Sequence, residues 1–267
     1  HTASQISAVL PEQAPRLVVA WLEQQWRKAR EAVPEPVRNG DEIEAVAPVT
    51  TFRERPVSTL LESRELHDLP AIAEAAPQYF VEAIWPLFLE LLETVTREAH
   101  PFVVGYRDAG LLVDDPDEDT RLERPLATAL FLAVETWAKT NPATFLAFAR
   151  SHADKDCLLV QRLLATGLRH CVSHAADEVL GFLCADPRRL VIGPHSESHR
   201  DSKKLIEALA PHLASGQLHQ LEQTILNSHR YSRFPDDDAE TRMKRLRWDR
   251  EHRLRLLRGL PRQYMSE

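Results

Sequence analysis

The chain has 267 residues, which suffices for a sizeable core or for an elongated array of helix pairs. Its formal net charge is −7, so the protein as a whole is not built as a nucleic-acid binder. No apolar run approaches the roughly 20 residues that cross a bilayer, which excludes a membrane-spanning helix. The three cysteines, an odd number without a secretory signal, predict reduced thiols in a cytoplasmic protein.

The first half of the chain alternates amphipathic segments with proline-rich connectors. In order, the pattern predicts a helix over 12–33, a connector near 34–56, a weaker helix over 57–75 broken at Pro70, a strongly apolar helix over 77–100 and a connector near 101–124. Pro86 should kink or divide the apolar helix. The second connector carries an acidic cluster, 114–119, which is typical of a solvated loop and lacks the glycine and terminal glutamate of a calcium-binding EF-hand loop.

The second half is a run of helices with short breaks. The pattern predicts helices over 125–139, 142–153, 157–172, 175–184, 201–213, 216–226 and 239–258. Helices joined by loops this short should lie antiparallel to their neighbours. We interpret the apolar run from Asp186-Pro187 to Gly193-Pro194 as a connection between repeats and not as a site.

A proline starts three apolar helices at a near-constant interval. Pro15, Pro77 and Pro142 are 62 and 65 residues apart, and each is followed three positions later by a large apolar residue. Proline is tolerated there because the first N–H groups of a helix have no intrahelical partner. The alternative is that proline simply begins many helices. The pattern favours an all-α fold, an α-solenoid of HEAT-like antiparallel helix pairs, as a single repeat domain over 1–267.

No sequence motif for catalysis is present. The chain lacks a phosphate-binding loop and a Gly-x-Ser-x-Gly elbow, so we predict no catalytic residue, no cofactor and no enzyme activity of this chain. Two histidine pairs, His170 with His174 and His195 with His199, have the spacing of zinc ligands on a helix. Neither carries the glutamate of an HExxH motif, so we predict no metal site and keep a metal-dependent enzyme as the weakest hypothesis.

The strongest functional signal is a basic segment over 242–262. It contains nine basic residues and only two acidic ones. The residues that we predict to contact a polyanion or a partner are Arg242, Lys244, Arg245, Arg247, Arg250 and Arg253. Leu246, Leu254 and Leu257 would be left to pack. The segment is either a surface for phosphates or an acidic partner, or a solvated helix paired with acidic groups of its own chain.

Four stretches of the second half, 175–193, 201–206, 221–226 and 254–261, carry one resemblance. The first stretch contains Asp-Glu-Val-Leu-Gly-Phe-Leu and Asp-Pro-Arg-Arg-Leu, and the others contain Lys-Lys-Leu-Ile, Leu-Glu-Gln-Thr-Ile-Leu and Leu-Leu-Arg-Gly-Leu-Pro. This order resembles the C-terminal helical-repeat region of large bacterial STAND (NACHT-like) NTPases, several of which act in antiphage defence. These motifs are structural, so no site residue transfers. The phosphate-binding loop and effector of that family are not in this chain.

The resemblance implies a non-catalytic sensor or scaffold that binds a protein partner, either a phage protein or neighbouring domains of the same chain. Because the chain begins His1-Thr2-Ala3 without a methionine, we expect a piece of a longer protein. The alternative hypothesis is a nucleic-acid-binding helical module that uses the basic segment 242–262.

Overall fold

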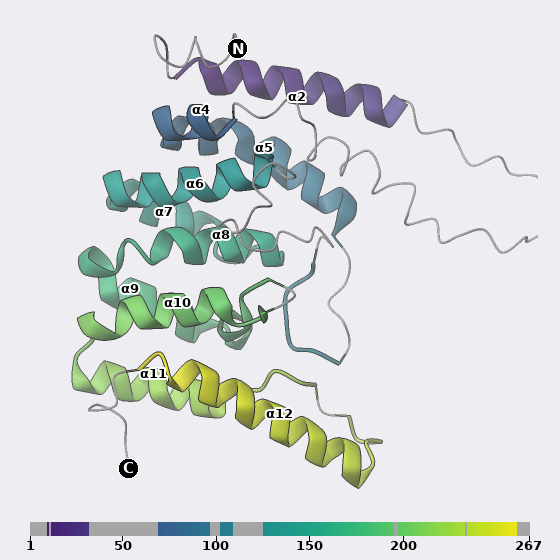
Figure 1. Ribbon diagram of the computed structural model, residues 1–267, viewed down its shortest axis with the longest axis vertical. Coiled ribbons are helices and arrows are strands. Elements are labelled where there is room, and N and C mark those ends of the chain that lie inside the picture. The colour runs from purple at the N-terminus through teal and green to yellow at the C-terminus, as the bar shows by residue number, and fades with distance from the viewer. Residues whose placement is uncertain are drawn as a thin grey trace, which may run out of the picture. The chain divides into compact units, whose positions relative to one another are not determined.

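A computed structural model describes residues 10, 12–31, 69–96, 102–108, 125–194, 197–232 and 234–260. Within these residues every regular element is a helix, apart from one isolated antiparallel bridge between Val103 and Tyr231 (Figure 1). The all-α prediction is therefore confirmed for the described chain. The connector 34–56 and the acidic cluster 114–119 lie outside the described residues.

The helices follow the order expected from the sequence. They are α2 (Ala14–Glu31), α4 (Leu69–Ala75), α5 (Pro77–Val95), α6 (Pro125–Thr140), α7 (Pro142–His152), α8 (Leu158–Leu168), α9 (Val172–Ala185), η3 (Pro187–Val191), α10 (Arg200–Leu209), η5 (Ala210–His212), α11 (Ser215–Asn227) and α12 (Ala239–Leu257). Most bounds differ from the predicted ones by a few residues, as helix ends commonly do.

Prolines behave as helix starts rather than as breaks. Pro77 and Pro142 are the first residues of α5 and α7, and Pro15 is the second residue of α2. Pro70, predicted to break a helix, instead lies in the first turn of α4. Pro86 lies inside α5 without dividing it into two elements. Because Pro125 and Pro187 also begin helical elements, a proline start by itself does not mark a repeat.

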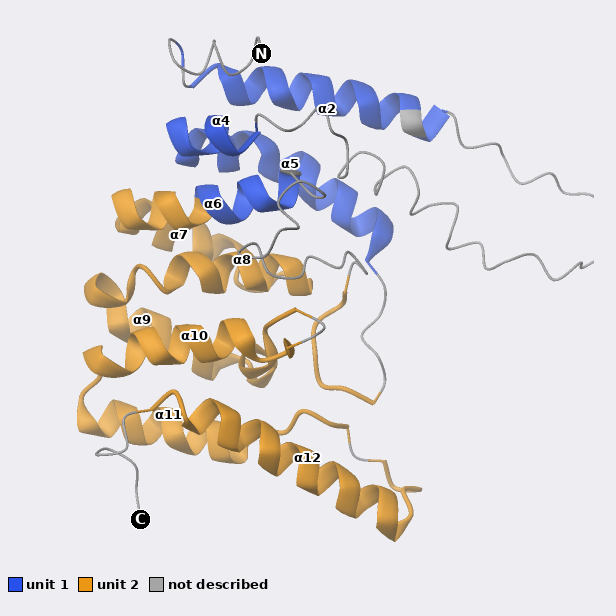
Figure 2. Ribbon diagram, viewed as in Figure 1, with its two compact units in different colours: residues 1–96, 109–133 blue, residues 97–108, 134–267 orange. Residues whose placement is uncertain are grey.

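The described chain forms two compact units, with the boundary inside α6 between Ala133 and Val134 (Figure 2). In the first unit, α5 packs on α2 and α4. The apolar faces of these three helices meet in the core of the unit. The indole of Trp26 in α2 donates a hydrogen bond to Glu90 in α5, with 3.0 Å between Nε1 and Oε1. The largest fully buried side chains of α5 are Phe80, Ile84, Phe88 and Leu91, and Trp85 is buried beside them. The organisation of 1–267 as a single repeat domain stays a prediction.

In the second unit each helix packs on its near neighbours in the chain. Helix α8 contacts α7 and α10, α10 contacts α9, α9 contacts α11, and α12 lies against α10 and α11. A buried ion pair joins α8 to α10, with 2.8 Å between Nε of Arg162 and Oδ2 of Asp201. Because charges this deeply buried lose their hydration, they persist only when paired.

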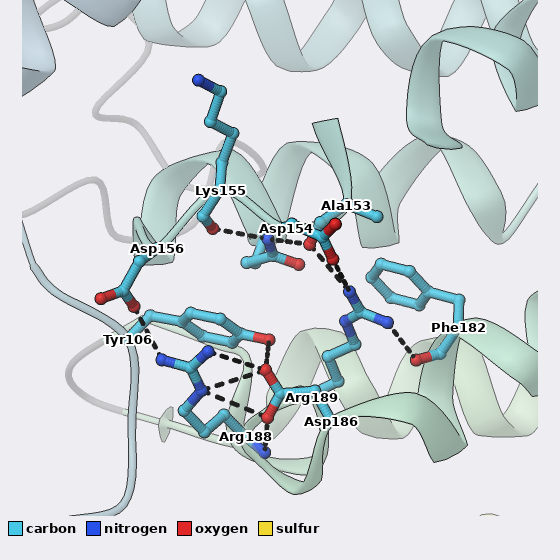
Figure 3. Close-up of polar contacts among 10 residues, drawn as sticks. Tyr106, Ala153, Asp154, Lys155, Asp156, Phe182, Asp186, Arg188 and Arg189 are labelled. Carbon is cyan, nitrogen blue, oxygen red and sulfur yellow. Dashed lines mark hydrogen bonds and ion pairs between the residues drawn. The ribbon is translucent and has the colours of Figure 1, made fainter. Parts of the chain in front are cut away.

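The residues between α9 and α10 fold into η3, which carries a pair of arginines with different tasks (Figure 3). The guanidinium of Arg189 is buried; it donates to the carbonyl oxygens of Phe182 and Ala153, both at 2.8 Å, and lies over the Phe182 ring. These carbonyls belong to the last turn of α9 and to the residue after α7, where backbone oxygens lack helical partners. Arg189 thus joins two helix ends.

Arg188, the other arginine of η3, holds the described part of the second connector. Its guanidinium binds Asp186 and Asp156 and lies 4.3 Å over the ring of Tyr106. Tyr106 donates its hydroxyl to Asp186 at 3.0 Å. Burial and the neighbouring Asp186 carboxylate raise the pKa of Tyr106, so the phenol keeps its proton and donates. The interpretation of 186–194 as a connection agrees with these contacts.

We predict that replacing the two arginines has unequal effects. Arg189→Ala should lower the free energy of unfolding by about 2–3 kcal/mol, because it removes the Arg189 donor from the buried Phe182 carbonyl and the contact with the Phe182 ring, whereas the Ala153 carbonyl keeps its hydrogen bond from Gln161 at 2.9 Å. Arg188→Ala, the matched control beside it, should cost about 1 kcal/mol, since Asp156 is exposed and Asp186 keeps its hydrogen bonds from Tyr106 and from the backbone amide of residue 188. Chemical denaturation of both variants measures the difference. Equal losses of unfolding free energy would contradict the conclusion that Arg189 joins the ends of α7 and α9.

Gly193 sits where two backbone segments approach closely. A Cβ atom there would overlap the carbonyl oxygen of Glu197 and lie 2.8 Å from the amide nitrogen of Arg200. We therefore predict that Gly193→Ala lowers the free energy of unfolding by more than about 2 kcal/mol. Gly181, inside α9 with open space around its Cα, is the control: Gly181→Ala should stabilise by about 0.5–1 kcal/mol. Thermal unfolding that ranks the two variants in the reverse order would refute the packing argument.

Candidate functional site: the basic helix α12

Helix α12 carries apolar residues on its exposed side as well as on its buried side. Asp238 caps the helix by accepting a hydrogen bond from the Thr241 amide at 2.6 Å, and seven basic and three acidic residues follow within its bounds. Its buried side chains are Asp249, His252, Leu256 and Leu257. Its exposed apolar side chains are Met243, Leu246, Trp248 and Leu254.

The prediction that Leu246, Leu254 and Leu257 pack was wrong for the first two, which are 40% and 48% exposed. The helix turns a different face to the unit because Asp249 is needed inside. Its carboxylate, only 1% exposed as a residue, accepts hydrogen bonds from the backbone amides of Arg230 and Tyr231 at 2.8 and 3.2 Å. Sequence reasoning missed this residue, although an acidic residue amid arginines was the available signal.

Arg245, one of the six predicted contact residues, is a structural residue in this fold. Its guanidinium forms an ion pair of 2.8 Å with Asp237, and both side chains are nearly buried. It also donates to the Ser232 carbonyl and lies 5.0 Å from the centre of the Phe234 ring. These contacts hold the segment before α12 against the helix, so the guanidinium of Arg245 is already engaged within the fold.

Arg253 also serves the fold. It donates to the carbonyl oxygens of Leu226 and Ser228, at 3.2 and 3.3 Å, where α11 ends. The last carbonyls of a helix have no intrahelical donor, and a neighbouring arginine is a common substitute. Arg253 therefore pins α12 to α11.

The other four predicted residues remain accessible. Lys244 and Arg247 form exposed ion pairs one turn away along the helix, with Glu240 and Glu251, which stabilise a helix by only about 0.3–0.5 kcal/mol. Arg242 donates to the Asp237 carbonyl at 3.0 Å and stays exposed. Arg250 is exposed and has no ion pair with any described residue. The six predicted residues thus fall into two sets. Four are exposed to solvent, and the other two, Arg245 and Arg253, contact other parts of the fold.

A cavity of about 410 Å³ opens beside the first two turns of α12. Its lining residues are Phe234, Pro235, Asp237, Arg242, Arg245, Leu246 and Asp249. The two carboxylates of the lining are already bound, Asp237 by Arg245 and Asp249 by backbone amides. What remains for a ligand is an apolar wall with the exposed Arg242 at the side, a combination suited to an apolar group next to an anion.

The histidine pairs do not form the arrangements considered from the sequence. His170 lies in the turn before α9, 3.2 Å from Glu135, and with His174 does not share a regular helix face. Hydrogen bonding to His170 lowers the pKa of Glu135 to about 2. His195 lies outside the described residues. Among the described part of the chain, no group of three or more His, Cys, Asp or Glu residues could hold a metal ion.

His199 instead meets His252 of α12, with 5.9 Å between ring centres and 3% exposure of each residue. Neither ring nitrogen of His252 has a hydrogen-bond partner among the described residues. Burial, and then the charges of His199, Arg230, Arg253 and Arg255, lower the pKa of His252 to about 3. The neutral ring is therefore part of the contact that holds α12.

None of the described helices is long and apolar enough to cross a membrane. Comparison of the chain with family models, with curated proteins and with solved structures found no match.

We predict that acid weakens the docking of α12. In the unfolded chain His252 takes up a proton near its ordinary pKa of about 6.5, whereas in the folded chain it does so only near 3. The contribution of the neutral His252 to the free energy of unfolding is fully present above pH ~6.5. It is lost as the pH falls toward 3, by up to about 1.4 kcal/mol per pH unit.

Denaturation between pH 8 and pH 5 measures this effect, in a window above the titration of most carboxylates. Between pH 8 and pH 5, the free energy of unfolding of His252→Phe should fall less than that of the wild type. A decline as steep as that of the wild type would remove His252 from the explanation.

Proposed function

We propose that this chain is a non-catalytic helical scaffold or sensor domain that binds a protein partner. The observation that carries the proposal is the solvent-facing side of α12, where exposed apolar side chains alternate with exposed arginines next to a cavity. Exposed apolar groups rimmed by charge are typical of protein interfaces, and arginine is enriched in them. Met243, Leu246 and Leu254 lie on the outer side of α12, where a helix that faces only solvent typically carries polar residues.

The packing of the second unit supports an α-solenoid of HEAT-like helix pairs. Helices contact their near neighbours in the chain, from α7 through α12, which is how repeat proteins distribute their core. Together with the resemblance to the C-terminal region of bacterial STAND NTPases, this favours a sensor region of a cytoplasmic antiviral NTPase.

The test uses the longer gene product in which this chain would occur. We expect it to encode a phosphate-binding loop upstream of His1, and the purified full-length protein to retain a defined phage protein in a binding assay with individually purified candidates. The same protein with Arg242, Arg247 and Arg250 replaced by Glu should lose that interaction. If the full-length protein retains none of the phage proteins, the sensor function is refuted.

Nucleic-acid binding is the second candidate function. It is favoured by Arg250, which has no ion pair with a described residue, beside the exposed Arg242 and Arg247. It predicts binding to duplex DNA or RNA at low salt, weakening steeply as salt rises. The charge-reversed variant above should abolish it. The control reverses Arg16, Arg27 and Lys28 on α2, which makes the same change in net charge elsewhere. Absence of binding at low salt would eliminate this candidate.

A further inference from the structure

The exposed side of α12 forms one continuous stripe. Met243, Leu246, Arg247, Arg250 and Leu254 are all exposed, and each lies three or four residues from another of the set. We call these five residues the α12 stripe. Leu246 belongs both to the stripe and to the wall of the 410 Å³ cavity, so the two features form one surface.

From this surface we infer that an acidic segment of a partner protein docks along the α12 stripe, with one large apolar or aromatic side chain inserted into the cavity. The inference rests on the proposed function, because it names the chemistry of the partner that the scaffold would bind. Its carboxylates would pair with Arg242 and Arg250, on either side of the inserted residue.

The charge of the surface selects an acidic partner. The acidic groups of the cavity cannot attract a cation, since Asp237 is neutralised by Arg245 and Asp249 is occupied by two backbone amides. Among the described residues, the exposed guanidinium groups of Arg242 and Arg250 provide positive charge along the helix, and one exposed carboxylate, that of Asp236, lies between the lining residues Pro235 and Asp237. An anionic segment therefore meets complementary charge at this place although the whole chain carries −7.

The lining of the cavity selects an apolar anchor. A volume of about 410 Å³ holds a large side chain, and Phe234, Pro235 and Leu246 provide an apolar wall. The wall is also rigid, because Phe234 stacks edge-on against Phe102 at 5.4 Å between ring centres and Arg245 lies over both rings. A preformed wall keeps the ordering cost of binding low.

Other occupants fit less well. A nucleic acid would use the arginines but would leave the apolar wall and the exposed leucines without a partner. A second copy of this chain, related by a two-fold axis through the stripe, would place Arg247 and Arg250 against their own counterparts and would be repelled. An acidic protein segment uses both the charges and the cavity.

The experiment measures binding of fluorescent synthetic peptides to the intact chain by anisotropy. The probes are peptides of about twelve residues, an acidic run of Glu and Asp with Trp, Leu or Ala at the centre. We expect the Trp and Leu peptides to bind about tenfold more tightly than the Ala peptide. Leu246→Ser should remove that preference, and Arg242→Glu should weaken all three peptides about tenfold.

Lys244→Glu is the matched control, since it reverses a charge on the same helix but lines no part of the cavity. It should leave the Trp peptide's affinity within about twofold. Thermal unfolding of each variant checks that α12 stays docked. Equal affinity for the Trp and Ala peptides, or equal losses in Lys244→Glu and Arg242→Glu, overturns the inference. So does a self-associating chain whose dimer is broken by Leu246→Ser, or duplex DNA that binds more tightly than every peptide.

The two proposals fail separately. If the peptides do not bind while the full-length protein still retains a phage protein, only the docking site is wrong. If no phage protein is retained but the peptide preference holds, the docking site stands and the antiviral setting is wrong.

Discussion

The second unit depends on charged side chains that serve backbone groups where helices end. Helix ends and the turns between them expose amides and carbonyls that no helical hydrogen bond satisfies, and burying them unpaired is costly. Arg189 supplies donors to two carbonyls at once, and Asp249 accepts from two consecutive amides. These are long-range contacts, so each one also ties two parts of the chain together.

This constraint changes the meaning of the basic helix. A cluster of arginines in a sequence looks like a surface for anions, but Arg245 and Arg253 are turned toward carbonyls and an aspartate of their own unit. Only the remaining side of α12 is available for recognition. The basic segment of this chain, whose net charge is −7, therefore combines structural and exposed arginines on one helix.

The same packing leaves apolar residues outside. Because Asp249 and His252 occupy the inward face of α12, Leu246 and Leu254 are displaced to the outward one. That arrangement forgoes apolar burial in the helix–helix contact, and it places in the interior a neutral histidine, His252, whose ring nitrogens have no hydrogen-bond partner among the described residues. An exposed stripe obtained at the expense of burial is more readily explained by a partner than by folding alone.

The local sequence determined the helices of this protein, because apolar spacing, proline starts and the near absence of glycine act within a few residues. Pro77 and Pro142 as first residues of α5 and α7 show how far such signals reach. The tertiary structure alone decided which side of α12 faces inward. Spacing offers several faces to a helix with arginines all around. The choice is made by the amides of Arg230 and Tyr231 and the carbonyls at the end of α11, which meet α12 only after the chain has folded.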